Sequence, residues 1–119
     1  MTNGHFDFEV EGVKYSLHFG NIAIEQFSRL SMEGFQSGVV GDVKSFTDMV
    51  FSGLYNAALI EGKNTPKYLH AAELVDLLID NELDEIQEEI VNTYKNSRAS
   101  VKQLERLNKN KEIKKKKPK

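Results

Sequence analysis

Two short runs of alternating apolar and polar residues open the chain, one over residues 6–10 and one over residues 13–19. Alternation of this kind predicts strands with one apolar face, and Glu11-Gly12 between them predicts a two-residue hairpin turn. That turn pairs Val10 with Val13, Phe8 with Tyr15, Phe6 with Leu17, and Glu9 with Lys14. A bulged variant of the turn would shift this pairing locally. Because an isolated hairpin is marginal in water, we expect its apolar face to rest on helices.

Helical spacing of apolar residues begins directly after the hairpin. Asn21 offers a helix cap, and a short apolar stripe follows it. The stripe consists of Ala23, Ile24, Phe27 and Leu30. We expect this helix to end near Met32, because residues 31–44 contain several glycines and little periodicity. That segment is predicted to be a mobile loop in which Phe35, Val39 and Val40 are partly exposed.

A longer helical pattern runs through the middle of the chain. Ser45 followed by Asp48 resembles a capping box with Asp in place of the usual Glu, which predicts the start of a central helix. Its apolar positions recur at helical spacing, at Phe46, Met49, Val50, Gly53, Leu54 and Ala57. Gly53 lowers helix propensity by about 1 kcal/mol relative to Ala, and close approach of another backbone commonly compensates. Together with Ala57, Gly53 predicts that another element crosses this helix at close range.

Two further helices are predicted after residue 64. Thr65-Pro66 indicates the start of the third, because proline is favoured at the first helical position after a threonine cap. Asn81 is expected to cap the fourth, whose first turn is rich in acidic residues that suit a helix N-terminus. The apolar stripe of this last helix thins beyond Tyr94, where the helix continues either as one rod or as two pieces.

These elements predict an α+β fold, mainly α, in which an N-terminal β-hairpin packs on about four helices and the last helix extends beyond the others. The length of 119 residues with 39% apolar content suits one domain. We divide the chain into an acidic hairpin and helical domain over residues 1–94, an amphipathic basic helical extension over residues 95–107, and a lysine-rich tail over residues 108–119. The tail is expected to be disordered unless it is bound.

Charge is distributed very unevenly around Tyr94. Up to that residue the chain carries five basic and 16 acidic side chains, whereas 11 basic and two acidic side chains follow it. A tail of this kind is explained by solubilisation or by sequence accident, by association with the acidic body, or by capture of a partner. Clustered lysines also attract nucleic acid, but residues 109–119 contain neither the arginines nor the aromatics that usually accompany such binding.

Residue types and spacing exclude most catalytic and metal-binding classes. The chain has no cysteine, and its three histidines, His5, His18 and His70, form no metal-binding pattern. His18 is predicted to be a solvated residue on the polar face of its strand. The acidic residues between Asp76 and Glu89 are best explained as a solvated helix face, and no nucleophile, phosphate-binding or dinucleotide motif occurs. We therefore expect no catalytic residues, no metal and no cofactor.

A candidate partner-binding surface lies on the basic extension. Tyr94, Val101, Leu104 and Leu107 form an apolar seam at helical spacing. Either the seam packs back on the domain, or it remains open and binds a partner.

Targeting signals favour the cytoplasm. Residues 1–5 lack the basic and apolar regions of a signal peptide, and no apolar run approaches the roughly 20 residues of a membrane span. The absence of cysteine suits a reducing compartment. A cytoplasmic protein without a membrane partner is predicted.

Three segments resemble one protein family. Gly12–Gly20 resembles the opening strand of tail assembly chaperones from long-tailed, siphovirus-like bacteriophages and related prophages. Met49–Ala57 is similar to the family's small-residue helix with its Gly-Leu and Ala pattern, and Thr65-Pro66 leading to residues 75–80 resembles its next helix. The resemblance covers about residues 8–92. The glycine-bearing loop over residues 34–41 is long for the family, and the third helix lacks the usual acids at its start.

The resemblance implies a cytoplasmic, non-virion protein in the bacterial host. Such a chaperone coats the long helical tape measure protein and keeps it soluble until tail tube subunits polymerise around it. The resemblance implies that the protein acts by binding alone, without a cofactor and without catalytic turnover. Contact with the tail tube protein and self-association are further options. Many members also have a longer form made by programmed ribosomal frameshifting, and Lys114–Lys117 could be encoded by a slippery adenine-rich run. The alternative function is a small nucleic-acid-associated or regulatory protein that acts through its basic tail.

Overall fold

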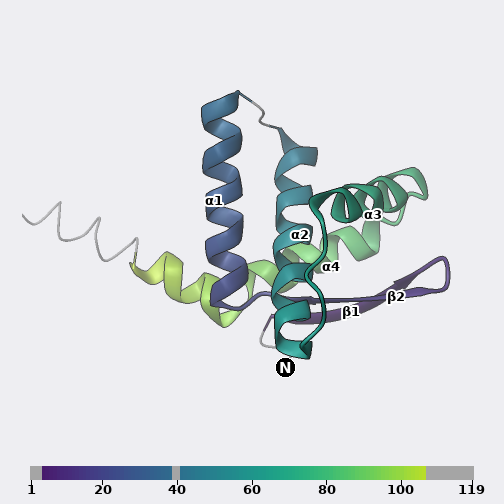
Figure 1. The fold of residues 1–119 in the computed structure, drawn as a ribbon, viewed down its shortest axis with the longest axis horizontal. Coiled ribbons are helices and arrows are strands. Elements are labelled where there is room, and N and C mark those ends of the chain that lie inside the picture. The colour runs from purple at the N-terminus through teal and green to yellow at the C-terminus, as the bar shows by residue number, and fades with distance from the viewer. Residues whose placement is uncertain (1–3, 39–40, 107–119) are drawn as a thin grey trace, which may run out of the picture.

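The computed structural model describes residues 4–38 and 41–106, which form a two-stranded antiparallel hairpin followed by five helices (Figure 1). The elements are β1 (His5–Val10), β2 (Val13–His18), α1 (Asn21–Ser37), α2 (Asp42–Glu61), α3 (Tyr68–Asp80) and α4 (Asp84–Lys95), with a final helix over residues 98–106. The predicted class, a mainly helical α+β fold with an N-terminal hairpin, is confirmed. The lysine-rich tail over residues 108–119 lies outside the described residues.

The hairpin has the predicted register, without a bulge. Val10 lies opposite Val13, Phe8 opposite Tyr15, Phe6 opposite Leu17, and Glu9 opposite Lys14. Glu11 and Gly12 have φ values of 51° and 81°. Two consecutive positive φ angles are those of a type I′ turn, whose twist matches that of the two strands. The register of the hairpin therefore follows from the Glu11-Gly12 turn.

Helix α2 is the centre of the molecule. It packs on α1, on α3 and on β2, and Figure 1 shows α1 and α2 standing side by side. The core around it contains Val10, Leu17, Phe19, Ala23, Met49, Val50, Phe51, Ala71, Leu74, Val75, Leu78 and Ile90. A helix with neighbours on three sides is buried over more than one apolar stripe, which explains why Phe51, Ser52 and Asn56 are buried outside the predicted stripe.

Gly53 lies at the predicted close approach. A Cβ atom at this position would lie 2.9 Å from a ring carbon of Phe19 and 3.1 Å from Cβ of Leu17. The close contact is therefore with side chains at the end of β2 rather than with another backbone. A glycine in α2 lets the hairpin sit against the helix.

The first helix is longer than predicted. It does not stop near Met32 but continues to Ser37, where Gly38 with φ 79° donates its N–H to the carbonyls of Gly34 and Phe35. Gly34 is buried inside the helix, so its packing offsets its low helix propensity. Most of the predicted loop is consequently helical, and Phe35 is 77% exposed. Val39 and Val40 lie outside the described residues.

The start of α2 was also predicted wrongly. The helix begins at Asp42 after Gly41, so the predicted capping box at Ser45 and Asp48 lies within it. Asp48 is instead 1% exposed and forms an ion pair with the partly buried Lys44. It also accepts a hydrogen bond of 2.6 Å from the Tyr68 hydroxyl. Burial and the Asp48 hydrogen bond raise the pKa of Tyr68.

Two more predicted helix starts are wrong. Thr65-Pro66 precedes α3 in an irregular segment, and Lys67 is the cap residue, because α3 starts only at Tyr68. Asn81 ends α3 rather than capping α4, and its side chain donates to the Leu77 carbonyl at 2.9 Å. Asp84 and Glu85 do occupy the first turn of α4, where acidic groups are favourable.

The cap of α1 comes from another helix. The cap residue is Gly20 rather than Asn21, and no side chain of α1 itself fills the role. Oδ1 of Asn56, on α2, accepts the N–H groups of Gly20 at 3.0 Å and Ala23 at 3.1 Å. This buried amide satisfies donors that a local cap usually satisfies.

Residues 82–106 form two helices rather than one rod. The chain turns at Asn96 and Ser97 between α4 and the helix over residues 98–106. Ser97 is fully buried, and its hydroxyl donates to the Tyr94 carbonyl at 2.8 Å and accepts the Ser100 N–H at 3.2 Å. Ser97 thus caps the last helix.

Across residues 4–38 and 41–106, no helix combines the length and apolar character required to traverse a bilayer.

Candidate apolar surface on the final helix

The helix over residues 98–106 carries the predicted partner-binding seam. Val101 is 43% exposed and Leu104 is 59% exposed, and both lie on one face because they are three residues apart. Ala99, Ser100 and Gln103 are half-buried on the side toward the body. The seam therefore does not fold back completely onto the domain.

Tyr94 anchors the base of this surface. Its ring makes edge contacts with Phe19 and Phe27, with centroid distances of 5.5 Å and 5.3 Å. Burial raises the pKa of the Tyr94 hydroxyl. Phe19 belongs to the core and Phe27 to α1, so the tyrosine connects the surface to the rigid part of the molecule.

The turn at Ser97 fixes the direction of the last helix. A Cβ atom on Gly4 would lie 2.7 Å from the Phe19 carbonyl oxygen and 3.0 Å from Cβ of Ser97. The Phe19 N–H also donates to the Gly4 carbonyl at 2.7 Å. Close packing of Gly4 against Ser97 thus holds the start of the final helix beside the core.

A shallow groove runs along the seam. Its lining residues are Tyr94, Lys95, Ser100, Val101, Gln103 and Leu104. Three of the four predicted site residues therefore line one groove, which we call the seam groove. The fourth, Leu107, lies outside the described residues.

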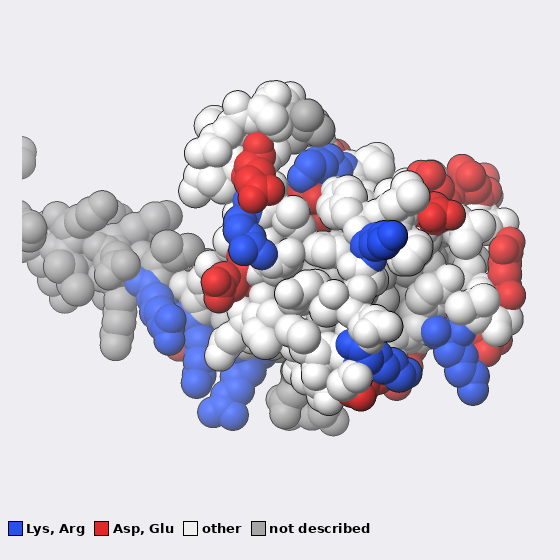
Figure 2. All heavy atoms as spheres, in the orientation of Figure 1, with Lys and Arg blue, Asp and Glu red and all other residues white. Residues whose placement is uncertain are grey.

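Basic side chains form a row along the final helix, and none of this row lines the seam groove. Arg98, Lys102 and Arg106 are exposed and follow one another at intervals of four, which places them along one side of the helix. Figure 2 shows basic side chains gathered at the lower left, along this helix, and acidic side chains on the right over α3 and α4. On its basic side, the helix forms a second groove with α1, lined by Glu25, Lys102 and Arg106 among others.

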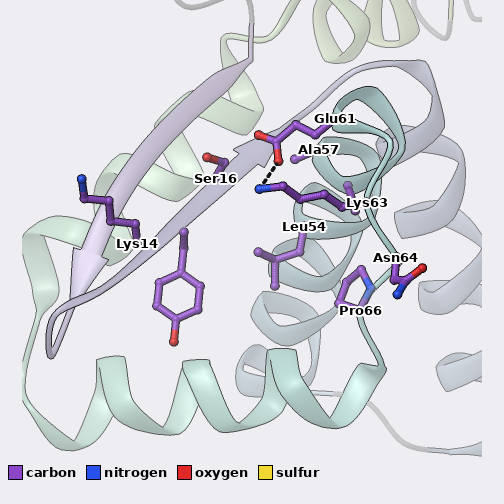
Figure 3. Close-up of a pocket in the computed structure, with 10 residues that line it drawn as sticks. Lys14, Ser16, Leu54, Ala57, Glu61, Lys63, Asn64 and Pro66 are labelled. Carbon is purple, nitrogen blue, oxygen red and sulfur yellow. Dashed lines mark ion pairs between the residues drawn. The ribbon is translucent and has the colours of Figure 1, made fainter.

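A different hollow lies between β2 and the C-terminal part of α2. Figure 3 shows Ser16 on the strand across from Ala57 on the helix, with Asn64 and Pro66 from the following segment. Lys14 and Leu54 also line the hollow. Nζ of Lys63 and Oε2 of Glu61 are 3.1 Å apart at its rim. Sequence reasoning missed this hollow, since it depends on how the hairpin crosses α2.

The tip of the α1 and α2 pair exposes further apolar side chains. Met32, Phe35 and Val43 are 60%, 77% and 57% exposed. The glycine-rich sequence predicted partial exposure at Phe35 but not a helical setting.

Two titratable groups of the hairpin have shifted pKa values, those of His18 and Asp7. His18 is half-buried rather than solvated, and burial, with the charge of His5 second, lowers its pKa. A hydrogen bond from Ser16 and another from His5 lower the pKa of the exposed Asp7. In the part of the chain that the structure describes, no three His, Cys, Asp or Glu residues gather closely enough to hold a metal ion.

Comparison with known protein families, with curated proteins and with solved structures finds no match to the chain.

Proposed function

We propose that this chain is a bacteriophage tail assembly chaperone that binds the tape measure protein in the host cytoplasm and keeps it soluble for tail tube assembly. The proposal rests on the resemblance in residues 8–92 and on the seam groove. A chaperone of this kind needs apolar surface that is open in the free protein. Val101 and Leu104 provide such surface, and their exposure is the observation that carries the proposal.

The seam groove suits reversible binding. Full burial of a valine or leucine side chain stabilises a complex by about 1.5–3 kcal/mol, and these two are already partly covered. A single contact of this size gives only weak affinity after the entropy of association is subtracted. Many copies along one long helical partner would together keep it soluble, while each copy could still be displaced by a polymerising tube subunit.

Tyr94 and Ser97 support this role by holding the groove in place. Because the tyrosine ring packs on Phe19 and Phe27, the final helix is positioned before the partner arrives. A positioned helix loses less conformational entropy on binding than a flexible segment. No bond is made or broken, so the proposed mechanism is binding and release.

The proposal is tested by co-expression with the tape measure protein encoded in the same genome. We expect the two proteins to co-purify and the tape measure protein to stay in the soluble fraction. An insoluble tape measure protein that does not associate with this chain would refute the chaperone function.

The alternative function, nucleic-acid binding through the basic tail, makes a different prediction. It requires salt-sensitive binding to DNA or RNA that disappears when residues 108–119 are removed. Weak binding that is unchanged by the truncation counts against it.

A further inference from the structure

We propose that the final helix binds the same helix of a second copy in antiparallel orientation, so that Val101 and Leu104 of one chain pack on Leu104 and Val101 of the other. The inference is carried by these two exposed aliphatic side chains and by the opposite charges of Arg98 and Glu105 beside them. It does not require the proposed function. Where both hold, the second copy and the tape measure protein compete for one surface.

The apolar part of this surface matches itself. Val101 and Leu104 are three residues apart, so they lie on one face of the helix, about 4.5 Å apart along its axis. Their side chains are 43% and 59% exposed. When two such helices meet in opposite directions about a two-fold axis, each Val101 faces a Leu104. The same patch on two copies therefore covers all of these aliphatic side chains at once.

Arg98 and Glu105 lie together along one edge of this apolar patch. They are seven residues apart, which is nearly two helical turns, so both lie on the same side of the helix, next to Val101. Both side chains are exposed, and neither lines the seam groove. No ion pair between described residues involves either of them. Each of these charges can therefore pair with a second chain.

The charges select the antiparallel direction. In that direction the side with Arg98 and Glu105 meets the same side of the second copy, so each Arg98 lies near the Glu105 of the other chain. The centres of the ion pairs and of the apolar contacts differ by about one residue, or roughly 1.5 Å along the axis. In a parallel pair, each Arg98 would face the other Arg98 and each Glu105 the other Glu105, which is unfavourable.

The other basic side chains of this region do not oppose the contact. Lys102 and Arg106 line the groove with α1, away from the aliphatic patch. Lys95 is the single basic residue that lines the seam groove, and it is exposed, so its ammonium group keeps its contact with water. Nucleic acid fits this surface less well, because phosphate would meet aliphatic side chains and a carboxylate there.

The surface is small, which makes the contact weak. A stable interface buries roughly 800 Å² on each partner, more than two aliphatic side chains and their flanking charges provide. We expect a monomer–dimer equilibrium with a dissociation constant between about 10 µM and about 1 mM. At lower concentrations most chains are monomers, so Val101 and Leu104 are open to another partner.

Sedimentation velocity of the full chain tests the contact at concentrations from about 5 µM to about 1 mM. We expect the sedimentation coefficient of the wild type to rise toward that of a dimer. Val101→Ser with Leu104→Ser should keep the chain monomeric throughout, whereas Leu59→Ser with Ile60→Ser, at residues of similar exposure on α2, should dimerise as the wild type does. A wild type that stays monomeric, or a dimer that the first variant does not weaken, would overturn the inference.

Charge exchange tests the antiparallel direction. Arg98→Glu and Glu105→Arg each replace two attractive contacts by repulsive ones and should weaken the dimer about fivefold at low salt. The two substitutions together restore opposite charges and should return the dissociation constant to within about twofold of the wild type. Glu33→Arg, at an exposed position on α1, is the control with the same change of net charge as Glu105→Arg. If Glu33→Arg weakens the dimer as much as Glu105→Arg, or if the double exchange restores nothing, the inference is wrong.

Other occupants give distinct results, once circular dichroism has shown that each variant folds. If the chain stays monomeric and binds a labelled oligonucleotide that Arg98→Glu releases, nucleic acid uses this side of the helix and the inference is wrong. A monomeric chain that keeps the tape measure protein soluble refutes only this inference. A chain that dimerises through Val101 and Leu104 but leaves the tape measure protein insoluble refutes only the proposed function.

Discussion

Two polar side chains buried in α2 connect it to its neighbours. Asn56 is 3% exposed and accepts two N–H groups at the start of α1, and Asp48 is 1% exposed and binds Lys44 and the Tyr68 hydroxyl. A buried polar atom is costly when it loses its partner, so each of these contacts specifies how one helix meets another. Sequence reasoning placed Asp48 in a local cap and gave Asn56 no role, because Tyr68, which binds Asp48, and the two donors to Asn56 are distant in the chain.

Replacement of Asn56 tests the long-range cap. Asn56→Ala leaves two buried N–H groups without an acceptor and should lower the free energy of unfolding by about 1–3 kcal/mol. Urea denaturation measures the change. Asn21→Ala is the matched control, because Asn21 is the exposed residue that the sequence predicts as the cap. If the two substitutions cost the same, the cap assigned to Asn56 is wrong.

Replacement of Tyr68 tests the buried contact with Asp48. Tyr68→Phe removes a hydrogen bond to a charged group and should destabilise the fold by about 1.5–3 kcal/mol at neutral pH. The raised pKa of Tyr68 also predicts that stability depends on pH in the alkaline range. Below its ordinary pKa of 10.0 the hydroxyl is protonated in both states, so its contribution to stability is complete. Above that pH the unfolded chain loses the proton while the folded chain keeps it, so stability falls as pH rises.

The alkaline effect is measured as the urea midpoint between about pH 9 and about pH 11. We expect a shallower decline in Tyr68→Phe than in the wild type. Some decline remains, since burial also raises the pKa of Tyr94. Parallel curves would contradict the assignment of this effect to Tyr68.

At the scale of elements, local patterns predicted which segments are strands and helices. Alternation over residues 6–19 and the Glu11-Gly12 turn act within the hairpin, so its register follows from sequence alone. Helix ends did not follow, since α2 begins three residues before Ser45 and α3 begins three residues after Thr65. The same division holds for the site: helical spacing predicted the grouping of Val101 with Leu104, whereas the turn at Ser97 depends on packing against Gly4.

The contact between β2 and α2 is tested at Gly53. In an open helix, Gly→Ala stabilises by about 1 kcal/mol. Here the added methyl group would press on the buried ring of Phe19 at 2.9 Å, so Gly53→Ala should destabilise the fold by about 1–2 kcal/mol net. Thermal or urea denaturation measures this change in the free energy of unfolding.

Ser45→Ala on the same helix is the control for Gly53→Ala. Ser45 is exposed and lies within α2. Its replacement by Ala should leave the free energy of unfolding unchanged or raise it by roughly a few tenths of a kcal/mol. A stabilised Gly53→Ala variant would contradict the close packing of the hairpin on α2. If Ser45→Ala lowered the free energy of unfolding by about 1 kcal/mol, Ser45 would have the capping role that the sequence predicts.

At the scale of the whole molecule, the described residues form a packed core and a final helix with exposed apolar side chains. The core gathers around α2, while the final helix extends from α4 with one side on the body and the other in solvent (Figure 1). Acidic side chains lie over α3 and α4, and basic ones lie along the final helix (Figure 2). The proposed function uses this separation, because a partner would bind at one end of the molecule while the core keeps its packing.

The most direct test of the proposed role is the soluble fraction of the tape measure protein when it is co-expressed with wild-type and variant chains. Val101→Ser with Leu104→Ser should lower that fraction several-fold and leave the chain folded. Leu59→Ser with Ile60→Ser is the matched control, because these two residues are 43% and 62% exposed on α2 and Val101 and Leu104 are 43% and 59% exposed on the final helix. We expect the control to retain wild-type solubilisation. An equal soluble fraction with both double variants would contradict binding through the seam groove.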